Sequence, residues 1–269
     1  MNDQQPQPPW TPTALAAEER ERVLALAAAP GAQAERQKLA AGFRVLAEVG
    51  VVQGLYQGLY GHISARVPNA PEYFWVNPIG VPFAAMTQDD LVLLSADGAI
   101  VSGAGMHNFA AFFIHSAIHR ARSDVNCVVH HHPAAACAFS ALGLLLQPID
   151  QVGCTFFEDH ALHLNYSGIV AEEEQAADIV RALGDKRALI LSNHGALTCS
   201  STIEQAIIDM YELERTCDVQ LRAMAAGGAL RLIDAEAARQ VRSIRTAPRR
   251  YRAEWAMLMR QLAAKAKPA

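Results

Sequence analysis

Apolar residues recur at helical spacing near both ends of the chain. In residues 33–52 they return every three or four positions and so share one face of a helix. These positions are Leu39, Phe43, Leu46 and Val49. A shorter helix is expected at 17–29. Residues 200–228 predict the clearest helix, and its start matches an S-x-x-E capping box formed by Ser201 and Glu204.

The middle of the chain changes to the pattern of short strands separated by Gly, Pro and Asn. Residues 61–67, 73–80 and 91–103 are apolar or aromatic runs of this kind, and Asp97-Gly98 predicts a tight turn in the last of them. Further strands are expected at 125–132 and 188–199, the second interrupted by a turn. Helices are expected at 107–124, with Asn108 as a possible N-cap, at 135–143 and at 172–186.

Length and composition indicate a globular protein. The chain has 269 residues, of which 51% are hydrophobic and 19% charged, enough for a sizeable core. A net charge of -4 without a basic run argues against a nucleic-acid partner. No apolar stretch reaches the roughly 20 residues that span a membrane, and the N-terminus has no signal-peptide pattern. Five scattered cysteines without a CxxC pair favour free thiols, so a cytoplasmic location is expected.

The chain divides into three parts by pattern. Residues 1–34 are expected to form a disordered or short helical N-terminal extension, Gln- and Pro-rich at its start. Residues 35–228 carry the alternating strands and helices of one domain. Residues 229–269 are Arg-rich and amphipathic, and predict a helical C-terminal extension.

Three consecutive histidines, 130–132, follow an apolar strand. Successive side chains of a strand point to opposite faces, so His130 and His132 share one face and His131 takes the other. Such a pair can bind one cation, although catalytic zinc usually takes three protein ligands. Alone, the pair is equally well explained as buried or edge histidines that bind nothing.

A second apolar strand ends in Asn193-His194-Gly195, where Gly195 is expected to permit a sharp bend. His194 can complete a set of three with His130 and His132. Neither motif contains a carboxylate, so a bound divalent ion would keep its full charge and act as a strong Lewis acid.

In this combination the sequence resembles the class II aldolase/adducin family. The resemblance covers residues 35–228 and rests on motifs in the family's order: "GHIS" (61–64), "NPIG" (77–80), the block "IHSAIHRARSDVNCVVH", the N-H-G strand and a long helix with E-L-E. It implies an α/β fold, a three-layer α/β/α sandwich with a central, mostly antiparallel sheet. It also implies a homotetramer with active sites at subunit interfaces.

The resemblance assigns site residues as well. It makes His130, His132 and His194 the ligands of one divalent metal ion per chain, Zn²⁺ first, with Mn²⁺ or Fe²⁺ as alternatives. The turn motifs imply a small-molecule substrate that is bound by four residues: His62, Ser64, Asn77 and Gly80.

The sequence departs from the sugar-phosphate aldolases of this family at two points. In those enzymes a carboxylate 19 residues before the H-x-H strand serves as the acid/base group, and that position is Ala111 here. Their phosphate-binding Ser pair is replaced by Phe109-Ala110. A phosphate needs hydroxyl, backbone or cationic partners, so we expect no sugar phosphate. Phe112, between Phe109 and Phe113, indicates an apolar or aromatic substrate, unless these rings only fill the core.

Without a carboxylate at Ala111, proton transfer needs another group. His115 and His119 share one helical face, and "FFEDHALH" offers Glu158, Asp159, His160 and His163. His115 has an equal claim to a supporting role that orients a metal ligand, and Glu158 to a place among surface charges.

The resulting hypothesis is a metal-dependent lyase that cleaves a C–C bond next to a metal-bound carbonyl or hydroxyl of an aromatic or apolar oxo or hydroxy acid. Retro-aldol cleavage and decarboxylation leave the same enolate-like species, so the sequence does not separate them. One alternative is an Fe(II)-dependent decarboxylating oxygenase, because residues 140–163 resemble the oxygenases of aminocoumarin biosynthesis. The other is a non-enzymatic, adducin-like interaction domain, although adducins have lost the metal histidines.

Overall fold

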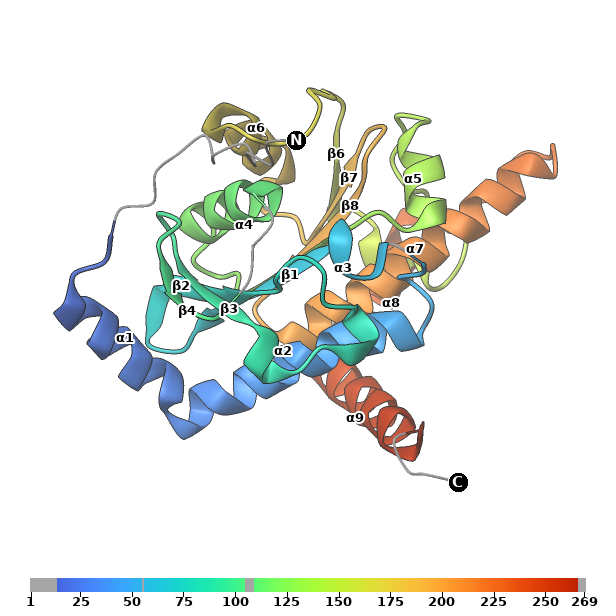
Figure 1. The fold of residues 1–269 in the computed structure, drawn as a ribbon. Helices are drawn as coiled ribbons and strands as arrows, with labels where there is room; N and C mark the ends of the chain where they lie inside the picture. The colour runs from blue at the N-terminus through green and yellow to red at the C-terminus, as the bar shows by residue number, and fades with distance from the viewer. Residues whose placement is uncertain (1–13, 55, 105–108, 266–269) are drawn as a thin grey trace.

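The strands of the described residues form one sheet. The computed structural model describes residues 14–54, 56–104 and 109–265. The strand order is β4-β3-β2-β1-β5-β8-β7-β6 (Figure 1). The strands are β1 His62–Val67, β2 Ala70–Val76, β3 Val92–Ser95, β4 Ile100–Ser102, β5 Cys127–His131, β6 His160–His163, β7 Ala188–Leu191 and β8 Gly195–Ser200.

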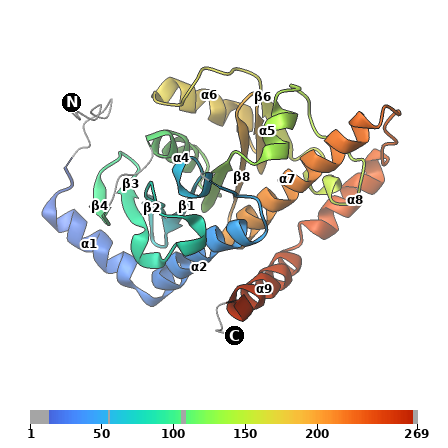
Figure 2. The same cartoon turned by 45° about the vertical axis from the view of Figure 1, so that its right-hand side comes forward.

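Helices cover both faces of this sheet (Figures 1 and 2). They are α1 Ala17–Ala28, α2 Pro30–Glu48, α3 Tyr56–Leu59, α4 Phe109–Ala121, α5 Ala134–Ser140, α6 Glu173–Leu183, α7 Ile203–Ala225, α8 Ala235–Arg245 and α9 Pro248–Lys265. Short 3₁₀ turns are η1 Phe83–Ala85, η2 Gln88–Asp90 and η3 Gly153–Phe156. Within the described ranges no helix is long and apolar enough to cross a membrane.

Alternation along the central strand β5 creates two separate cores. Val129 packs in one apolar cluster with residues of α2 and α7, such as Ile207. Its neighbour Val128 points to the opposite face and packs in a second cluster with residues of α4 and α6, such as Ile118. Because neighbouring strand residues face opposite sides, both faces must be covered, which gives the predicted α/β/α layers.

The sheet is mixed. β6 runs parallel to β7, while the other neighbouring strands pair in antiparallel fashion. The sequence did not predict β6, because its four residues, His160–His163, are too few to show a clear alternation.

The start of α7 differs from the predicted capping box. The N-cap is Thr202, whose extended backbone allows its hydroxyl to accept a hydrogen bond from the N–H of Gln205 at 3.3 Å. The carboxylate of Glu204 instead pairs with Lys38 of α2 at 3.3 Å. Asn108, the other predicted cap, lies outside the described residues.

A buried ion network attaches the C-terminal helices to the domain. Asp209 of α7 is 0% exposed, forms an ion pair with Arg187 and accepts a hydrogen bond from Tyr251 of α9 at 2.7 Å. Arg187 also pairs with Asp159 at 2.7 Å. A buried carboxylate is tolerated only when its partners satisfy it, so these contacts fix α9 on α7.

We therefore expect Asp209→Ala to lower the free energy of unfolding by about 3–5 kcal/mol, because it leaves the Arg187 guanidinium buried with one partner fewer. Asp218→Ala, on the exposed surface of the same helix, removes only the pair with Arg222 and should cost less than about 1 kcal/mol. Urea unfolding of both variants measures the difference. Equal losses would show that Asp209 is not a structural anchor.

Candidate metal centre

Two neighbouring strands bring the histidine motifs to one edge of the sheet. β5 ends at His131, and β8 begins at Gly195; the two strands pair with His131 opposite Ala196. The turn between β7 and β8 carries His194 and lies at the upper end of the sheet in Figure 1. In this turn the N–H of His194 donates to the carbonyl of Leu191 at 3.0 Å. His132, the residue after β5, therefore lies beside His194.

Three imidazoles meet at this edge. The candidate ligand atoms of His130, His132 and His194 all lie within 4.8 Å of one another. The Nε2 atoms of His130 and His194 are 3.3 Å apart. Each pair of ring centroids is 4.8 Å apart. The structure thus brings together the three residues that the sequence motifs nominated.

The hydrogen bonds of this cluster leave ring nitrogens free for a cation. His130 Nδ1 lies 3.0 Å from the carbonyl of Ala196 and donates to it, which leaves Nε2 unprotonated and directed at His194. His132 Nε2 is buried and has no hydrogen-bond partner among the described residues. Buried, unsatisfied nitrogens of this kind are costly unless something binds them. The residues present therefore fit a divalent metal ion.

Burial keeps the three rings neutral. It lowers the pKa of His130 well below the ordinary value, and the neighbouring imidazoles lower it further. Burial also lowers the pKa of His132 to about 4 and lowers the pKa of His194. Neutral imidazole is the form that binds metal, so the site is ready for a cation at neutral pH.

The sequence predicted that Gly195 permits a sharp bend. In the structure the bend and the close approach of the two strands come from different residues, Asn193 and Gly195. The bend comes from Asn193, whose φ is 55° in the left-handed region. Gly195 is needed for close approach instead. A Cβ atom there would lie 2.6 Å from the carbonyl oxygen of His131 and 2.9 Å from Cδ2 of His132. A side chain at this position would clash with both groups, so either the backbone at His131 or the ring of His132 would have to move.

His131 takes the other face, as the strand pattern predicts. Its ring packs edge-on against Phe83, with the centroids 5.7 Å apart. Its Nδ1 accepts the backbone N–H of His132 at 2.7 Å. The ring fits because Gly61, the residue before β1, has no side chain; a Cβ there would lie 2.2 Å from Cδ2 of His131.

A second buried histidine network adjoins the cluster. The His62 ring lies 4.9 Å from the His130 ring, and its Nδ1 is 2.7 Å from Nε2 of His115. Ser64 Oγ lies 2.5 Å from His115 Nδ1 and 2.8 Å from His119 Nε2. Both ring nitrogens of His115 are therefore occupied within the protein, and the network orients His62 beside the cluster.

Asn77 and Gly80 shape the turn that presents His62. The side-chain oxygen of Asn77 accepts the N–H of Ile63 at 3.1 Å, and its amide donates to the carbonyl of Gly61 at 3.2 Å. Gly80 has a φ of 90° and donates its N–H to the carbonyl of Gly58 at 2.8 Å. These contacts give Asn77 a role in holding the strand.

Two of the proposed acid/base residues lie elsewhere. Glu158 pairs with Arg239 of α8 at 2.7 Å on the surface. His160 begins β6 opposite Ala188, which is the end of β7 remote from His194. Its Nδ1 donates to the carbonyl of Phe156 at 2.7 Å and its Nε2 accepts the N–H of Leu146 at 2.9 Å. The structure does not bring either residue to the three histidines.

The phenylalanines of α4 lie in the core. Phe112 and Phe113 are 6% and 7% exposed and belong to the apolar cluster beneath α4 and α6, together with Ala111. Both rings therefore fill the core, and they do not indicate an aromatic substrate. The side chain of Phe109 lies outside what the structure describes.

Two contacts near the cluster were not predicted from the sequence. His163 Nε2 lies 2.8 Å from a carboxylate oxygen of Asp178, and its carbonyl accepts the N–H of Ser192 in the turn before His194. Glu214 of α7 caps the helix that follows His132. His163 belongs to "FFEDHALH" and Glu214 to the E-L-E motif, but neither motif predicts the contact, because the partners come from other parts of the chain.

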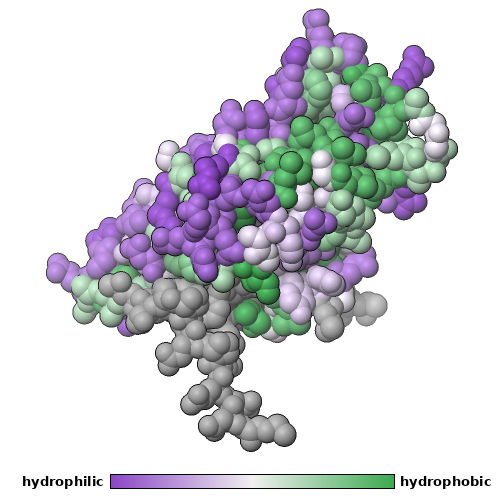
Figure 3. Space-filling model, turned by 90° about the horizontal axis from the view of Figure 1, so that it is seen from above, coloured by the Kyte–Doolittle hydropathy of each residue, from purple (hydrophilic) through white to green (hydrophobic). Residues whose placement is uncertain are grey.

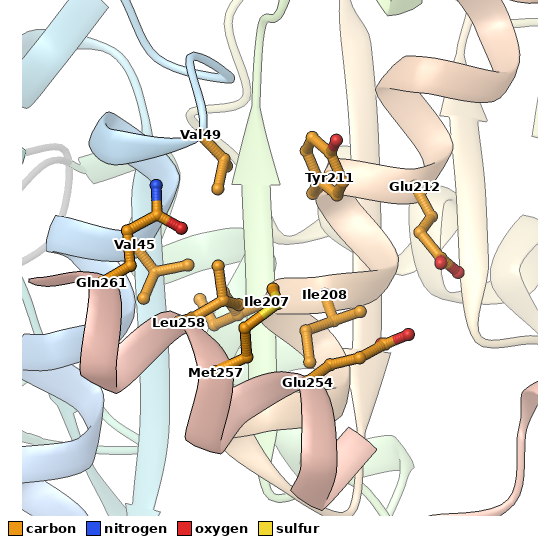
Figure 4. Close-up of a pocket in the computed structure, with 10 residues that line it drawn as sticks. All are labelled: Val45, Val49, Ile207, Ile208, Tyr211, Glu212, Glu254, Met257, Leu258 and Gln261. Carbon is orange, nitrogen blue, oxygen red and sulfur yellow. The ribbon is translucent and has the colours of Figure 1, made fainter. Parts of the chain in front are cut away.

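Two cavities open on the α2 and α7 side. One, of about 270 Å³, is lined by His131, His132, Cys137 and Glu214 among others. Another, of about 470 Å³, lies between α2, α7 and α9 and is mainly apolar (Figure 4). Figure 3 views the molecule from above, towards the end of the sheet that carries the β7–β8 turn in Figure 1, and shows apolar side chains gathered over part of that end. The loops after α5 and β6 expose several large apolar side chains: Leu142, Leu144, Leu145, Leu164, Tyr166 and Ile169.

The sandwich fold with three converging histidines defines a class of α/β proteins with a histidine cluster at one edge of the sheet. Residues 37–221 match the family described as the Class II Aldolase and Adducin N-terminal domain. The chain belongs to this family, and the predicted fold class is confirmed.

Relatives within the family have different activities in their names. The 4-hydroxy-3-prenylphenylpyruvate oxygenase/4-hydroxy-3-prenylbenzoate synthase of Streptomyces roseochromogenus subsp. oscitans is 40% identical over 183 residues, 68% of this chain and 66% of that protein. Decarboxylase NovR of Streptomyces niveus is 39% identical over 171 residues, 63% of each chain. Both matches span slightly less than two thirds of the relative.

A solved structure is similar over nearly the whole chain. The L-fuculose 1-phosphate aldolase from Glaciozyma antarctica PI12 has 32% sequence identity and a TM-score of 0.75, covering 94% of this chain and 93% of that one.

The buried histidines predict a steep loss of stability in acid. Burial lowers the pKa of His115 to about 3, from 6.5 in the unfolded chain. Between these values the unfolded chain binds a proton at this position and the folded chain does not. Stability therefore falls as pH falls through this window, by about 1.4 kcal/mol per pH unit for each such histidine.

We expect His115→Gln to reduce the pH dependence of the free energy of unfolding between pH 6 and pH 4 by about 1.4 kcal/mol per pH unit, which corresponds to one proton. Urea unfolding of metal-free protein at several pH values measures it, because metal loss then makes no contribution. An unchanged slope would contradict a neutral, buried His115.

Proposed function

We propose that this protein is a metal-dependent lyase that cleaves a C–C bond next to a carbonyl or hydroxyl group of an aromatic oxo or hydroxy acid. The observation that carries the proposal is the cluster of His130, His132 and His194, three neutral imidazoles whose ring nitrogens converge. Among the described residues this cluster contains no carboxylate.

The three histidines would hold one divalent ion, which we propose to be Zn²⁺, with Mn²⁺ or Fe²⁺ as alternatives. Such an ion supplies positive charge where negative charge develops on a substrate oxygen as the neighbouring C–C bond breaks. Three neutral ligands do not reduce that charge, whereas a carboxylate ligand would.

The neighbouring histidines prepare the substrate side of the site. We propose that His62, whose ring contacts His130, binds the substrate there. His115 and Ser64 hold the His62 ring in one orientation, and His119 closes the network. Each of these four residues is at most 3% exposed, so the network is fixed before substrate arrives. We propose a positioning role for His115 and His119, and structural roles for Glu158 and His160.

The aromatic substrate class rests on the relatives. Two proteins about 40% identical to this chain carry a decarboxylase name and a prenylphenylpyruvate oxygenase name. The name of the structural neighbour, a fuculose 1-phosphate aldolase, suggests a sugar phosphate instead. Against that substrate stands Ala111, which is 1% exposed and carries no group that can move a proton. The expected homotetramer stays a prediction.

A second candidate function is an iron-dependent oxygenase, favoured by the name of the relative that is 40% identical. The two candidates demand different properties of the metal. A lyase uses only its charge, whereas an oxygenase must transfer electrons to oxygen, which Zn²⁺ cannot do.

The first expected result concerns metal content. Wild-type protein should bind about one Zn²⁺ per chain, and His132→Gln should weaken its affinity by at least about 100-fold, because it removes a direct ligand. His160→Gln is the matched control, since His160 is also buried but bonds only to backbone groups. Titration against a chelator gives both affinities. Equal affinities in the two variants would exclude the proposed ligand set.

The second expected result concerns turnover. Metal-free protein is reconstituted with Zn²⁺, Mn²⁺ or Fe²⁺, each with and without oxygen. It is then offered a 4-aryl-4-hydroxy-2-oxo acid, an aryl-substituted hydroxy-dicarboxylate, an arylpyruvate or L-fuculose 1-phosphate. We expect Zn²⁺ under nitrogen to support cleavage of one of the first two, measured as release of aldehyde or CO₂.

Other outcomes contradict this proposal in distinct ways. Turnover of the arylpyruvate only with Fe²⁺ and stoichiometric oxygen uptake would establish the oxygenase. Faster cleavage of L-fuculose 1-phosphate would establish a sugar-phosphate aldolase. No turnover by any metal-loaded form would favour an interaction domain.

A further inference from the structure

Glu214 of α7 makes an unusual contact with the helix that follows the metal-binding strand. Its carboxylate oxygens accept the backbone N–H groups of Ala135 at 2.9 Å and Ala136 at 2.7 Å. These are the first-turn donors of α5, which no intrahelical carbonyl can satisfy. The N-cap residue Pro133 provides no side-chain cap. Glu214 therefore supplies the missing cap from a residue far along the chain.

This contact acts next to a candidate metal ligand. β5 ends at His131 and α5 begins at Ala134, so His132 lies in the two-residue connection between them. On one side its N–H is held by the ring of His131 at 2.7 Å. On the other side its position depends on where α5 begins, and Glu214 determines that.

The same helix also touches the third histidine. The thiol of Cys137 in α5 donates to the backbone carbonyl of His194 at 3.3 Å. α5 thus contacts both ends of the cluster, His132 through the chain and His194 through this bond. A shift of α5 would change the distance between two of the three ring nitrogens.

Glu214 is not itself part of the metal cluster. Among the described residues the cluster consists of the three histidines, and both oxygens of Glu214 are directed at backbone N–H groups. A carboxylate at a helix N-terminus is also favoured by the helix dipole, so its stable place is at α5.

We propose that Glu214 is a positioning residue of the metal centre, which fixes the start of α5 and thereby holds His132 and His194 at the spacing that one cation requires. This inference rests on the proposed metal-dependent function. The inference adds Glu214, a residue of α7, to a site whose histidines lie at the edge of the sheet.

The test compares Glu214→Gln and Glu214→Ala with Glu204→Gln. The amide of Gln keeps one acceptor oxygen, whereas Ala keeps none, so the loss should be graded. We expect Zn²⁺ affinity to fall by about 10-fold in Glu214→Gln and about 100-fold in Glu214→Ala, the range for residues that orient metal ligands. Glu204, also on α7, pairs with Lys38, and its variant should bind like wild type.

Two further readouts separate positioning from general destabilisation. The visible spectrum of Co²⁺-loaded protein reports the ligand geometry and should change in Glu214→Gln but not in Glu204→Gln. Affinities are measured at a temperature where circular dichroism shows every variant folded, and Glu214→Gln decides the matter if Glu214→Ala does not fold.

Unchanged Zn²⁺ affinity and an unchanged Co²⁺ spectrum in Glu214→Gln would overturn the inference and leave the proposed function intact. Failure of wild-type protein to bind either metal would instead overturn the proposed function.

Discussion

The close pairing of β5 with β8 is the constraint on which the site depends. It brings residues more than 60 positions apart into contact, with His131 opposite Ala196. The approach is possible only because Gly195 has no side chain, since a Cβ would lie 2.6 Å from the neighbouring backbone. The strands thus provide the site with rigid supports, and His194 lies in the three-residue turn that joins β7 to β8.

Burial then gives the cluster its chemistry at the expense of stability. Desolvation makes a charged imidazole unfavourable, so the histidines at this edge and in the adjoining network stay neutral. The same desolvation leaves His132 Nε2 without a partner among the described residues. A cation that binds such a site would stabilise it, so the proposed metal binding would be coupled to folding.

The sequence predicted the parts of the site that local patterns encode. The alternation of a strand placed His130 and His132 on one face, and a second strand ending in His194 completed the set. Phe112, Glu158 and His160 were nominated on residue type alone, which does not determine the direction or partners of a side chain. Glu214 lies in the E-L-E motif, but the motif did not predict its contact with α5, and nothing in the sequence predicted the contact of Asp178 with His163. Each contact joins segments that only the tertiary fold brings near.

The described cluster contains no carboxylate, and such a cluster is compatible with more than one of the activities named among the relatives. Three neutral ligands leave a divalent ion its full charge, which suits a lyase, and they leave it coordination positions, which an oxygenase also needs. The histidine cluster alone therefore cannot select the reaction. The selection must come from the groups around it, and the buried His62–His115–Ser64–His119 network is the polar structure that adjoins it. That network contains no carboxylate, and Ala111 supplies none, so the protein presents imidazole nitrogens and a hydroxyl rather than a free acid beside the histidine cluster.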